Sequence, residues 1–581
     1  MTIQDSNKLS RLCFYTGFLL VSILAFTFLF SSICFFLRIT MTAWHFPIGT
    51  LAACALSYYF LSNHEKEQPV SILMLFGMTL GFVLIFVAMA SYFYDISFDG
   101  QAYHMEAMIQ MKHGWNPFYE QLPNTVNQAL WVNHYAKGME TVGAAINCTF
   151  NTIEAGKAAN FMIWLASFFF TFSFILRNQW TSVFKALLLS FIIACNPIVL
   201  NQLLTYYVDG PMGALLLCLI MLGLYILQTP RTVYFVMLFL TVFLLVNVKF
   251  TAVLYIAVFI GGYLIWALWK KNYVVAKQLW WTSVVAGLIA IVCGFNPYIT
   301  NTVNFGHPLY PLMGKNKVDI IYALNLPAGF ENKNGLERFF TALFSRTDNI
   351  YPNSIYPVEI KVPFTFNKID LAHAPMVDSR LGGFGPMFSG IVLLSIILAV
   401  LLYLNAGKEA FIGNMTWGLV FIIISIIVMP ESWWARYVPQ FWLLPLTLLL
   451  TAEVLFKNRY QLLKICIYTA LVINLAFCSA GFFFNMIVTS KINYQLALLK
   501  SSSQTVLVDL GESKSNRIRF SANHIPYRLA DFHLQEVNEE YMAGSQACFI
   551  WPSHTDKSIK EPWILKTAGK WLPFMWQYYG R

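Results

Sequence analysis

Charged residues are scarce in this sequence, and their scarcity decides the class of protein. Only 11% of the 581 residues are charged, whereas 58% are hydrophobic. A soluble globular domain carries about 25% charged and about 45–50% apolar residues. The composition therefore excludes a soluble enzyme and a disordered chain. Because no block of like charges suggests a tail for nucleic acid, we expect no nucleic-acid partner either. The composition predicts a polytopic membrane protein.

The cysteine motifs of metal and disulfide proteins are absent as well. The chain has ten cysteines but no Cys-x-x-Cys pair, and most of them lie in apolar runs. A cysteine in such a run is usually a small packing residue. We therefore expect neither a zinc site nor a disulfide framework. The one conceivable disulfide joins Cys148 to Cys548, which lie near expected water-facing segments.

Long apolar runs, in contrast, are abundant. A membrane-spanning helix needs about 20 apolar residues, and about thirteen runs come close to that length. They fall at 12–37, 43–61, 70–93, 157–176, 182–200, 211–228, 232–247, 250–268, 276–295, 386–404, 411–428, 438–456 and 465–487. The first run is too long for a signal peptide and no small-residue cleavage site follows it, so we interpret it as the first span. The expected fold is an all-α polytopic membrane protein.

Short basic connections follow every second apolar run and predict the orientation. Their basic residues are Lys66, Arg177, Arg231, Lys270, Lys271, Lys408, Lys457 and Arg459. By the positive-inside rule these connections are cytoplasmic, and so is the N-terminus. The C-terminus and all the long segments then lie outside, together with the short links at 201–210 and 429–437.

This topology also predicts the organisation of the chain. Two extra N-terminal helices occupy 1–69, and a transmembrane core with a first external loop at 94–156 occupies 70–295. A large external loop covers 296–385, and the last spanning helices cover 386–487. The tail, 488–581, mixes short β-rich runs with charged stretches, so we expect a small mixed α/β external domain. No internal repeat of fixed period is visible.

A short helix is predicted at 99–113 in the first external loop. Asp99 is suited to cap its start and Gly114 to end it. An apolar stripe at helical spacing consists of Tyr103, Ala107, Met108 and Met111. Because this segment is too short and too polar to span a bilayer, we expect it to lie flat on the membrane surface.

Two carboxylates at the start of this loop are candidates for chemistry. Asp95 and Asp99 come directly after a predicted span. A carboxylate at a membrane boundary beside an apolar groove is desolvated and well placed to act as a base. The residues alone leave a second interpretation open for each: Asp99 as a helix cap and Asp95 as a solvated loop residue.

Further polar clusters fall on the same predicted face. They contain Lys137 in the first loop, Asp209 in TYYVDGP, Asp378 and Arg380 in DSRLGGFGP, and Arg436 in PESWWARYVPQFW. For Arg436 the alternative is an arginine at a helix end whose side chain extends to the interface and pairs with Glu431. Trp433 and Trp434 fit an interfacial aromatic belt as well as a platform for a sugar.

In these motifs the sequence resembles the glycosyltransferase C superfamily, polytopic enzymes that use polyprenyl-phosphate-linked sugars. The lipid A aminoarabinose transferases and the protein O-mannosyltransferases are similar in plan. These families have an acidic motif after an early span, followed by Tyr, Ala and a Gly. The matching residues are Asp99, Tyr103, Ala107 and Gly114, with Gly100 in place of the usual second acid. The resemblance covers roughly residues 70–450.

Two other positions match the family in part. Lys137 matches a Lys-Pro-Pro motif, although Gly138 and Met139 replace its prolines. Asp209 matches an acid of the second external loop. The resemblance implies a bacterial cytoplasmic (inner) membrane location with an active site facing outward.

The implied reaction moves a sugar from a polyprenyl-phosphate donor to a hydroxyl of a glycan, lipid or protein, in a single inverting displacement. Asp99 is then the expected base, with Asp95 and Asp209 as the other carboxylates. The expected ligands of the donor phosphate are Lys137, Arg436 and Arg380, and the expected substrate contacts are Tyr103, His104 and Tyr437. A divalent cation, Mg²⁺ or Mn²⁺, is a candidate cofactor, since two acids on one face suit one. Lys and Arg can do the same work alone, so the sequence leaves the metal open.

Two other functions remain open at this point. An O-antigen ligase or polymerase also joins lipid-linked sugars outside the membrane, but relies on basic and His residues in a late external loop. A transporter or flippase usually shows repeats and ionisable residues near the bilayer midplane. Here the acids gather at the outer boundary instead.

Overall fold

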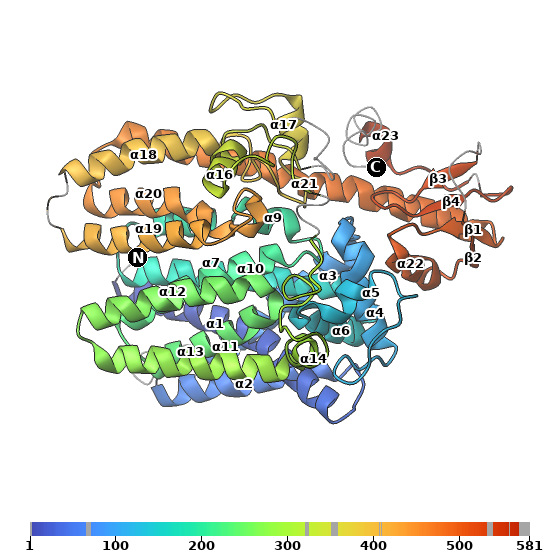
Figure 1. The fold of residues 1–581 in the computed structure, drawn as a ribbon, viewed down its shortest axis with the longest axis horizontal. Coiled ribbons are helices and arrows are strands. Elements are labelled where there is room, and N and C mark those ends of the chain that lie inside the picture. The colour runs from blue at the N-terminus through green and yellow to red at the C-terminus, as the bar shows by residue number, and fades with distance from the viewer. Residues whose placement is uncertain are drawn as a thin grey trace.

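The computed structural model describes residues 3–64, 71–319, 325–349, 358–405, 407, 409–531, 538–556 and 558–568. Within these ranges the chain is mostly helical, and a small sheet lies near its C-terminus (Figure 1). The predicted all-α bundle and mixed C-terminal part are therefore confirmed at this level.

Each apolar run of the sequence forms a helix of the bundle. These helices are α1 (Ile3–Phe36), α2 (His45–His64), α3 (Ile72–Tyr92), α7 (Ala158–Arg177), α8 (Val183–Ala194), α10 (Asp209–Gln228), α11 (Thr232–Val248), α12 (Phe250–Trp269), α13 (Tyr273–Cys293), α18 (Phe388–Asn405), α19 (Ala410–Ile427), α20 (Leu443–Leu455) and α21 (Gln461–Ser501). In the described part of the chain, nine helices are long and apolar enough to cross a membrane.

Several predicted spans are shorter than expected. The run at 182–200 breaks at Asn196, whose side chain caps a second helix, α9 (Pro197–Gln202). Proline at the first position of α9 has no N–H to continue the hydrogen bonding of α8. The run at 438–456 begins as a 3₁₀ turn before α20. These interruptions all lie near the same end of the bundle.

The bundle has one end with long connections and one end with short ones. Figure 1 shows the short link between α12 and α13 at the left, and the C-terminal sheet with α4, α5 and α6 at the right. This is the alternation that the basic connections predict. Lys66 and Lys408 of that prediction lie outside the described residues.

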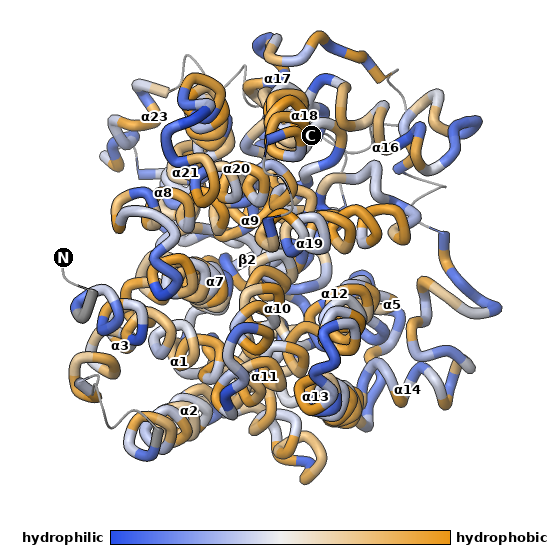
Figure 2. Tube along the Cα trace, turned by 90° about the vertical axis from the view of Figure 1, so that its left-hand side faces the viewer, coloured by the Kyte–Doolittle hydropathy of each residue, from blue (hydrophilic) through white to orange (hydrophobic). Residues whose placement is uncertain are grey.

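The core of the bundle is built around α1, which packs along α2, α7 and α11. Figure 2 looks along the helices and shows α1 between these neighbours. Many large apolar side chains on the outside of the bundle are exposed, among them Leu73, Phe184 and Val274. An exposed apolar surface around an apolar core is expected where lipid replaces water.

The first long connection is more buried than predicted. Residues 100–104 form a π-helical turn, which continues into α4 (Met105–Lys112); α5 (Ala129–His134) and α6 (Gly138–Phe150) follow. The prediction that 99–113 lies flat on the membrane surface is wrong. Met105, Met108 and Met111 are fully buried, because α6 and the C-terminal part of the chain cover α4.

The second long connection contains α14 (Phe295–Phe305), α16 (Gly335–Leu343) and α17 (Lys368–His373). The helices α16 and α17 both start with a capping box, formed by Asn334 with Glu337 and by Asn367 with Asp370. Such a box satisfies two backbone N–H groups that a helix start leaves without partners. The capping boxes therefore stabilise these two short helices, neither of which is long enough to span a bilayer.

The helix α21 joins the bundle to the C-terminal domain. The domain's sheet has the order β2 (Tyr527–Leu529), β1 (Val506–Asp509), β4 (Cys548–Ile550) and β3 (Glu539–Tyr541), with β1 and β2 parallel and the other pairs antiparallel. The helices α22 (Arg517–Ala522) and α23 (Trp563–Ala568) complete it. Val488 and Ile492 of α21 pack in its core, so the helix continues beyond the predicted boundary at 488.

All ten cysteines lie in the described residues and are free thiols. The conceivable disulfide between Cys148 and Cys548 is therefore not formed.

Candidate functional site

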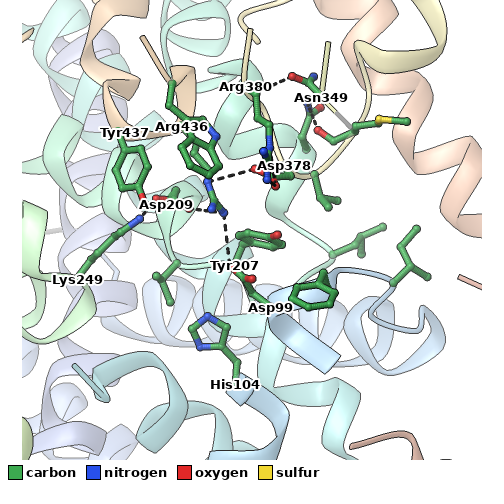
Figure 3. A pocket seen from close by; sticks show the side chains of 18 of the residues that line it. Asp99, His104, Tyr207, Asp209, Lys249, Asn349, Asp378, Arg380, Arg436 and Tyr437 are labelled. Carbon is green, nitrogen blue, oxygen red and sulfur yellow. Dashed lines mark hydrogen bonds and ion pairs between the residues drawn. The ribbon is translucent and has the colours of Figure 1, made fainter. Parts of the chain in front are cut away.

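A cavity of about 740 Å³ lies at the end of the bundle where the long connections gather. Segments far apart in the sequence build its wall: the turn after α3, the starts of α10 and α12, the segment before α18, and the link between α19 and α20. Residues of α21 and Gln546 of the C-terminal domain complete it. Figure 3 shows the polar side chains that point into this space.

Arg436 forms the electrostatic centre of the cavity. Its Nη1 atom lies 3.5 Å from Asp99 Oδ2 and 3.5 Å from Asp209 Oδ2, and its Nε atom lies 3.2 Å from Asp378 Oδ1 (Figure 3). Burial would lower the pKa of Arg436, but the surrounding carboxylates and Tyr207 outweigh burial and raise it above its ordinary value. The guanidinium is therefore a fixed positive charge shared by three acids.

Aromatic rings hold this guanidinium from the sides. The carbon at its centre lies 4.9 Å from the ring centroid of Tyr207 and 4.6 Å from that of Trp434. Arg380 lies 4.4 Å from the same Trp434 ring. A planar guanidinium stacks well on an aromatic face, which an ammonium group does not match. Trp434 thus sets the spacing of two arginines.

Arg380 is fixed by Asp378 and Asn349. Its Nη2 atom donates to Asp378 Oδ2 at 2.7 Å, and its backbone N–H donates to Asn349 Oδ1 at 2.5 Å (Figure 3). Burial raises the pKa of Asp378, but the charges of Arg380 and Arg436 outweigh it and hold this pKa below its ordinary value. Asp378 is therefore ionised and bridges the two arginines.

Lys249 also lines the cavity and reaches Asp209, one of the three acids around Arg436. It lies between α11 and α12 in an extended backbone conformation, which turns its side chain into the cavity. Its ammonium group pairs with Asp209 and lies 4.3 Å from the ring centroid of Tyr437. Asp209 is the first residue of α10, where the helix dipole favours a negative charge.

Asp99 is presented by the π-helical turn after α3. Its side chain makes no capping hydrogen bond, so the interpretation of Asp99 as a helix cap is not the one the structure adopts. The turn needs Gly100, because a Cβ atom there would lie 2.0 Å from Asp95 Oδ2. The Asp99 side chain is 20% exposed, compared with 1% for Asp209 and 14% for Asp378. It is the most accessible of the three acids around Arg436.

Seven of the nine predicted site residues line this cavity. They are Asp99, Tyr103, His104, Asp209, Arg380, Arg436 and Tyr437. His104 forms a 2.6 Å contact through Nδ1 with Oε1 of Glu140, and both side chains are buried.

Asp95 and Lys137 do not line the cavity. Asp95 is fully buried and accepts hydrogen bonds from the backbone N–H groups of Ser97 at 2.7 Å and Tyr206 at 2.8 Å. Lys137 donates to the carbonyl of Tyr135 at 2.8 Å and to Asn296 Oδ1 at 2.6 Å. Both side chains tie loops together, and neither interpretation of Asp95 from the sequence, base or solvated loop residue, matches this position.

Two alternatives for the motif PESWWARYVPQFW also differ from the structure: a pair between Arg436 and Glu431, and an interfacial belt of tryptophans. Glu431 accepts from Trp433 Nε1 at 2.7 Å, whereas Arg436 turns toward the cavity acids. Trp433 and Trp434 are buried and stack with ring centroids 5.4 Å apart, so they form no interfacial belt.

A divalent cation does not fit the cavity as it stands. Among the residues that the structure describes, no three His, Cys, Asp or Glu side chains form a group that could hold a metal ion. The three acids converge on Arg436, whose guanidinium takes the place between them. We therefore derive no step through a metal.

The sequence missed Lys249, Tyr207 and Asn349 as site residues, and it placed Asp378 in a polar cluster without assigning it a role. Asp378 stands two positions before Arg380, and this spacing of opposite charges was a usable signal. Lys249 lies between two apolar runs. A lysine at such a position has the same sequence pattern whether it forms a buried ion pair or only marks the end of a span. Asn349 carries no local signal, because only the fold brings it to Arg380.

Comparison of the chain with protein-family models and with curated proteins finds no match. The arguments for function therefore rest on the geometry of this cavity and on the motif resemblance described above.

Proposed function

We propose that this protein is a membrane glycosyltransferase that moves a sugar from a polyprenyl phosphate to a hydroxyl group of a glycan, lipid or protein. One observation carries the proposal: an accessible carboxylate, Asp99, faces a cluster of fixed cations at the head of an apolar helix bundle. The family resemblance of the motif around Asp99 supports the same reaction.

Asp99 is the proposed base. The acceptor oxygen forms a bond to the anomeric carbon, while the bond from that carbon to the phosphate oxygen breaks and its electron pair stays on the phosphate. The proton of the acceptor hydroxyl passes to the Asp99 carboxylate. This single displacement inverts the configuration, and a positioned base contributes about 10²–10⁴-fold to such a rate.

Arg436, Arg380 and Lys249 are the proposed partners of the phosphate. All three line the cavity, and each is paired with a carboxylate in the absence of substrate. The phosphate gains charge as the bond breaks, and one preorganised charge typically contributes about 10²–10³-fold. Lys249 takes the role that the sequence suggested for Lys137, since the side chain of Lys137 lies outside the cavity.

Apolar walls support the lipid part of the donor. On the side of α9 and α21 the cavity is lined by Leu200, Leu204, Cys478, Phe482 and Phe484. A prenyl chain has no polar group to satisfy, so such a wall suits it.

We infer an outward-facing site in a bacterial cytoplasmic membrane. The short end of the bundle carries Arg177, Arg231, Lys270 and Lys271, which favour a cytoplasmic location. The cavity lies at the other end, where the long connections gather. A reporter enzyme fused after the last residue should be active outside the cytoplasm, and a cytoplasmic C-terminus would contradict this orientation.

The decisive experiment measures sugar transfer by the purified protein from a panel of undecaprenyl-phosphate sugars. We expect Asp99→Asn to lower the rate about 10²–10⁴-fold at an unchanged melting temperature. The matched control is Asp556→Asn, which makes the same change at an exposed position of the C-terminal domain. Full activity of Asp99→Asn would refute Asp99 as the base. Saturable binding of another solute with no turnover of any donor would favour a transporter.

A further inference from the structure

A buried histidine and a buried glutamate meet at the cavity wall next to Asp99. His104 Nδ1 lies 2.6 Å from Glu140 Oε1, and the two side chains are 4% and 5% exposed. The other ring nitrogen, Nε2, is buried and has no hydrogen-bond partner among the described residues. His104 lines the cavity, and Figure 3 shows its ring below Asp99, on the side away from Arg436.

The π-helical turn explains why His104 shares a wall with Asp99. The two residues are five positions apart, which a regular α-helix would place about 140° apart around its axis. Here the N–H of Met105 donates to the carbonyl of Gly100, the i→i+5 pattern of a π-helix. The wider turn brings residue i+5 closer to the face of residue i. Such turns are frequent at functional sites.

Glu140 determines which ring nitrogen of a neutral His104 carries the proton. A carboxylate can only accept, so the short contact requires a proton on Nδ1. The lone pair of Nε2 is then left as a hydrogen-bond acceptor at the cavity wall. A buried acceptor without a partner is costly, and a donor from the ligand relieves that cost.

We propose that His104 Nε2 accepts a hydrogen bond from a hydroxyl group of the bound carbohydrate and selects ligands that carry this hydroxyl. Glu140 is a positioning residue, because it acts only through the imidazole. The inference rests on the proposed function and extends it to the substrate: the sugar carries a free hydroxyl on the side that faces this wall. A site built to bind a hydroxyl rejects the deoxy analogue, since its polar atom then stays unpaired.

Deoxy donors test this selection. Purified wild-type protein is compared on undecaprenyl-phosphate hexoses and on their monodeoxy analogues. We expect one deoxy position to lower kcat/KM about 10- to 100-fold, the effect of a hydrogen bond whose partner is polarised by a charge. His104→Asn keeps an amide near Glu140 but lacks an atom at the Nε2 position, so it should treat the parent and that analogue alike. His104→Gln reaches toward the Nε2 position and should keep part of the selection.

A matched control separates selection from packing. His134 is also buried and bonded through Nδ1, to Asn301, but it does not line the cavity. His134→Gln should leave the preference for the hydroxyl unchanged. Equal losses for the parent and every deoxy donor in His104→Asn would overturn the proposal, because a purely structural role predicts that result.

A spectroscopic measurement tests the inference independently of catalysis. Magnetic resonance of isotopically labelled imidazole nitrogens, assigned with His104→Gln, reports the tautomer of His104 directly. We expect Nε2 to be unprotonated without ligand and its signal to move when the parent donor binds. A proton on Nε2, with or without one on Nδ1, or an equal movement with every deoxy donor, would overturn the proposal. If the wild-type protein turns over no donor, the glycosyltransferase proposal fails, whereas these signals still decide the role of His104.

Discussion

Arg436 Nη1 lies 3.5 Å from Asp99 Oδ2, although 337 positions separate the two residues in the sequence. The same guanidinium pairs with Asp209 and Asp378, which come from two further segments. A single buried side chain thus connects the turn after α3, the start of α10, the segment before α18 and the link between α19 and α20.

Replacing Arg436 with methionine should destabilise the protein. The change leaves Asp99 without its cation, whereas Asp209 keeps Lys249 and Asp378 keeps Arg380. Breaking a buried ion pair typically costs about 3–5 kcal/mol. Arg436→Lys keeps the charge but loses the planar stack on Trp434, so its loss should be smaller. The melting temperature of the purified variants measures both effects.

A double-mutant cycle identifies the cause of this loss. Asp99→Asn removes the charge that loses its cation, so in the Arg436→Met background it should restore part of the stability. Additive losses of the two changes would show that the ion pair is not the source of the effect.

Asp95→Asn should lower stability while the rate per folded molecule stays close to that of the wild type. The two carboxylate oxygens accept from the N–H groups of Ser97 and Tyr206, and an amide provides only one acceptor oxygen. An unsatisfied buried N–H group costs about 1–3 kcal/mol. Thermal unfolding and transfer assays on the same preparation measure the two quantities. A large loss of rate at unchanged stability would instead make Asp95 part of the chemistry.

The sequence predicts the helices well because their signal is local. Each apolar run forms a helix, and the basic links predict which connections share an end of the bundle. Asp209 and Arg436 were recognisable for the same reason, since each follows a run that ends at that boundary. Lipid and protein interior both favour a helix, so an apolar run does not show by itself which of the two surrounds it. Among the described residues nine helices qualify as spans, and shorter apolar helices accompany them.

The direction in which a loop side chain points could not be predicted from the sequence. Asp95 and Asp99 have the same residue type and stand four positions apart, yet one faces the protein interior and the other faces the cavity. Asp95 lies in an irregular segment held by the N–H groups of Ser97 and Tyr206, whereas Asp99 is already in a helical conformation, and no propensity predicts that difference. The burial of α4 depends on residues 514–517, about 400 positions later, where Arg517 pairs with Glu106. Local patterns carry no information over such a separation.

Lys137 should make the stability of the folded protein depend on pH in the alkaline range. Burial lowers its pKa from 10.5 to about 7, against the opposing charge of Glu140. Because the unfolded chain holds this proton over a range in which the folded protein does not, the contribution of Lys137 to stability rises with pH between about 7 and 10.5. Lys137→Met removes this contribution. From about pH 7 to about pH 9 the melting temperature of the wild type should rise relative to that of the variant. Parallel pH profiles of the two proteins would contradict the assignment.

Arg519 should hold the C-terminal domain against the turn that carries Asp99. Its Nη2 atom donates to the carbonyl of Asp95 at 2.7 Å and to Glu154 Oε1 at 3.1 Å, and the side chain is buried. Arg519→Met leaves both acceptors without this donor, although Glu154 keeps its pair with Lys157, and a lost buried hydrogen-bond partner costs about 1–3 kcal/mol. We expect faster proteolysis after α21 and a lower transfer rate, because the turn at 100–104 loses its support. Arg528→Met makes the same change on the exposed strand β2 and should affect neither. If Arg519→Met accelerated proteolysis but left the transfer rate unchanged, the domain would stabilise the protein without positioning Asp99.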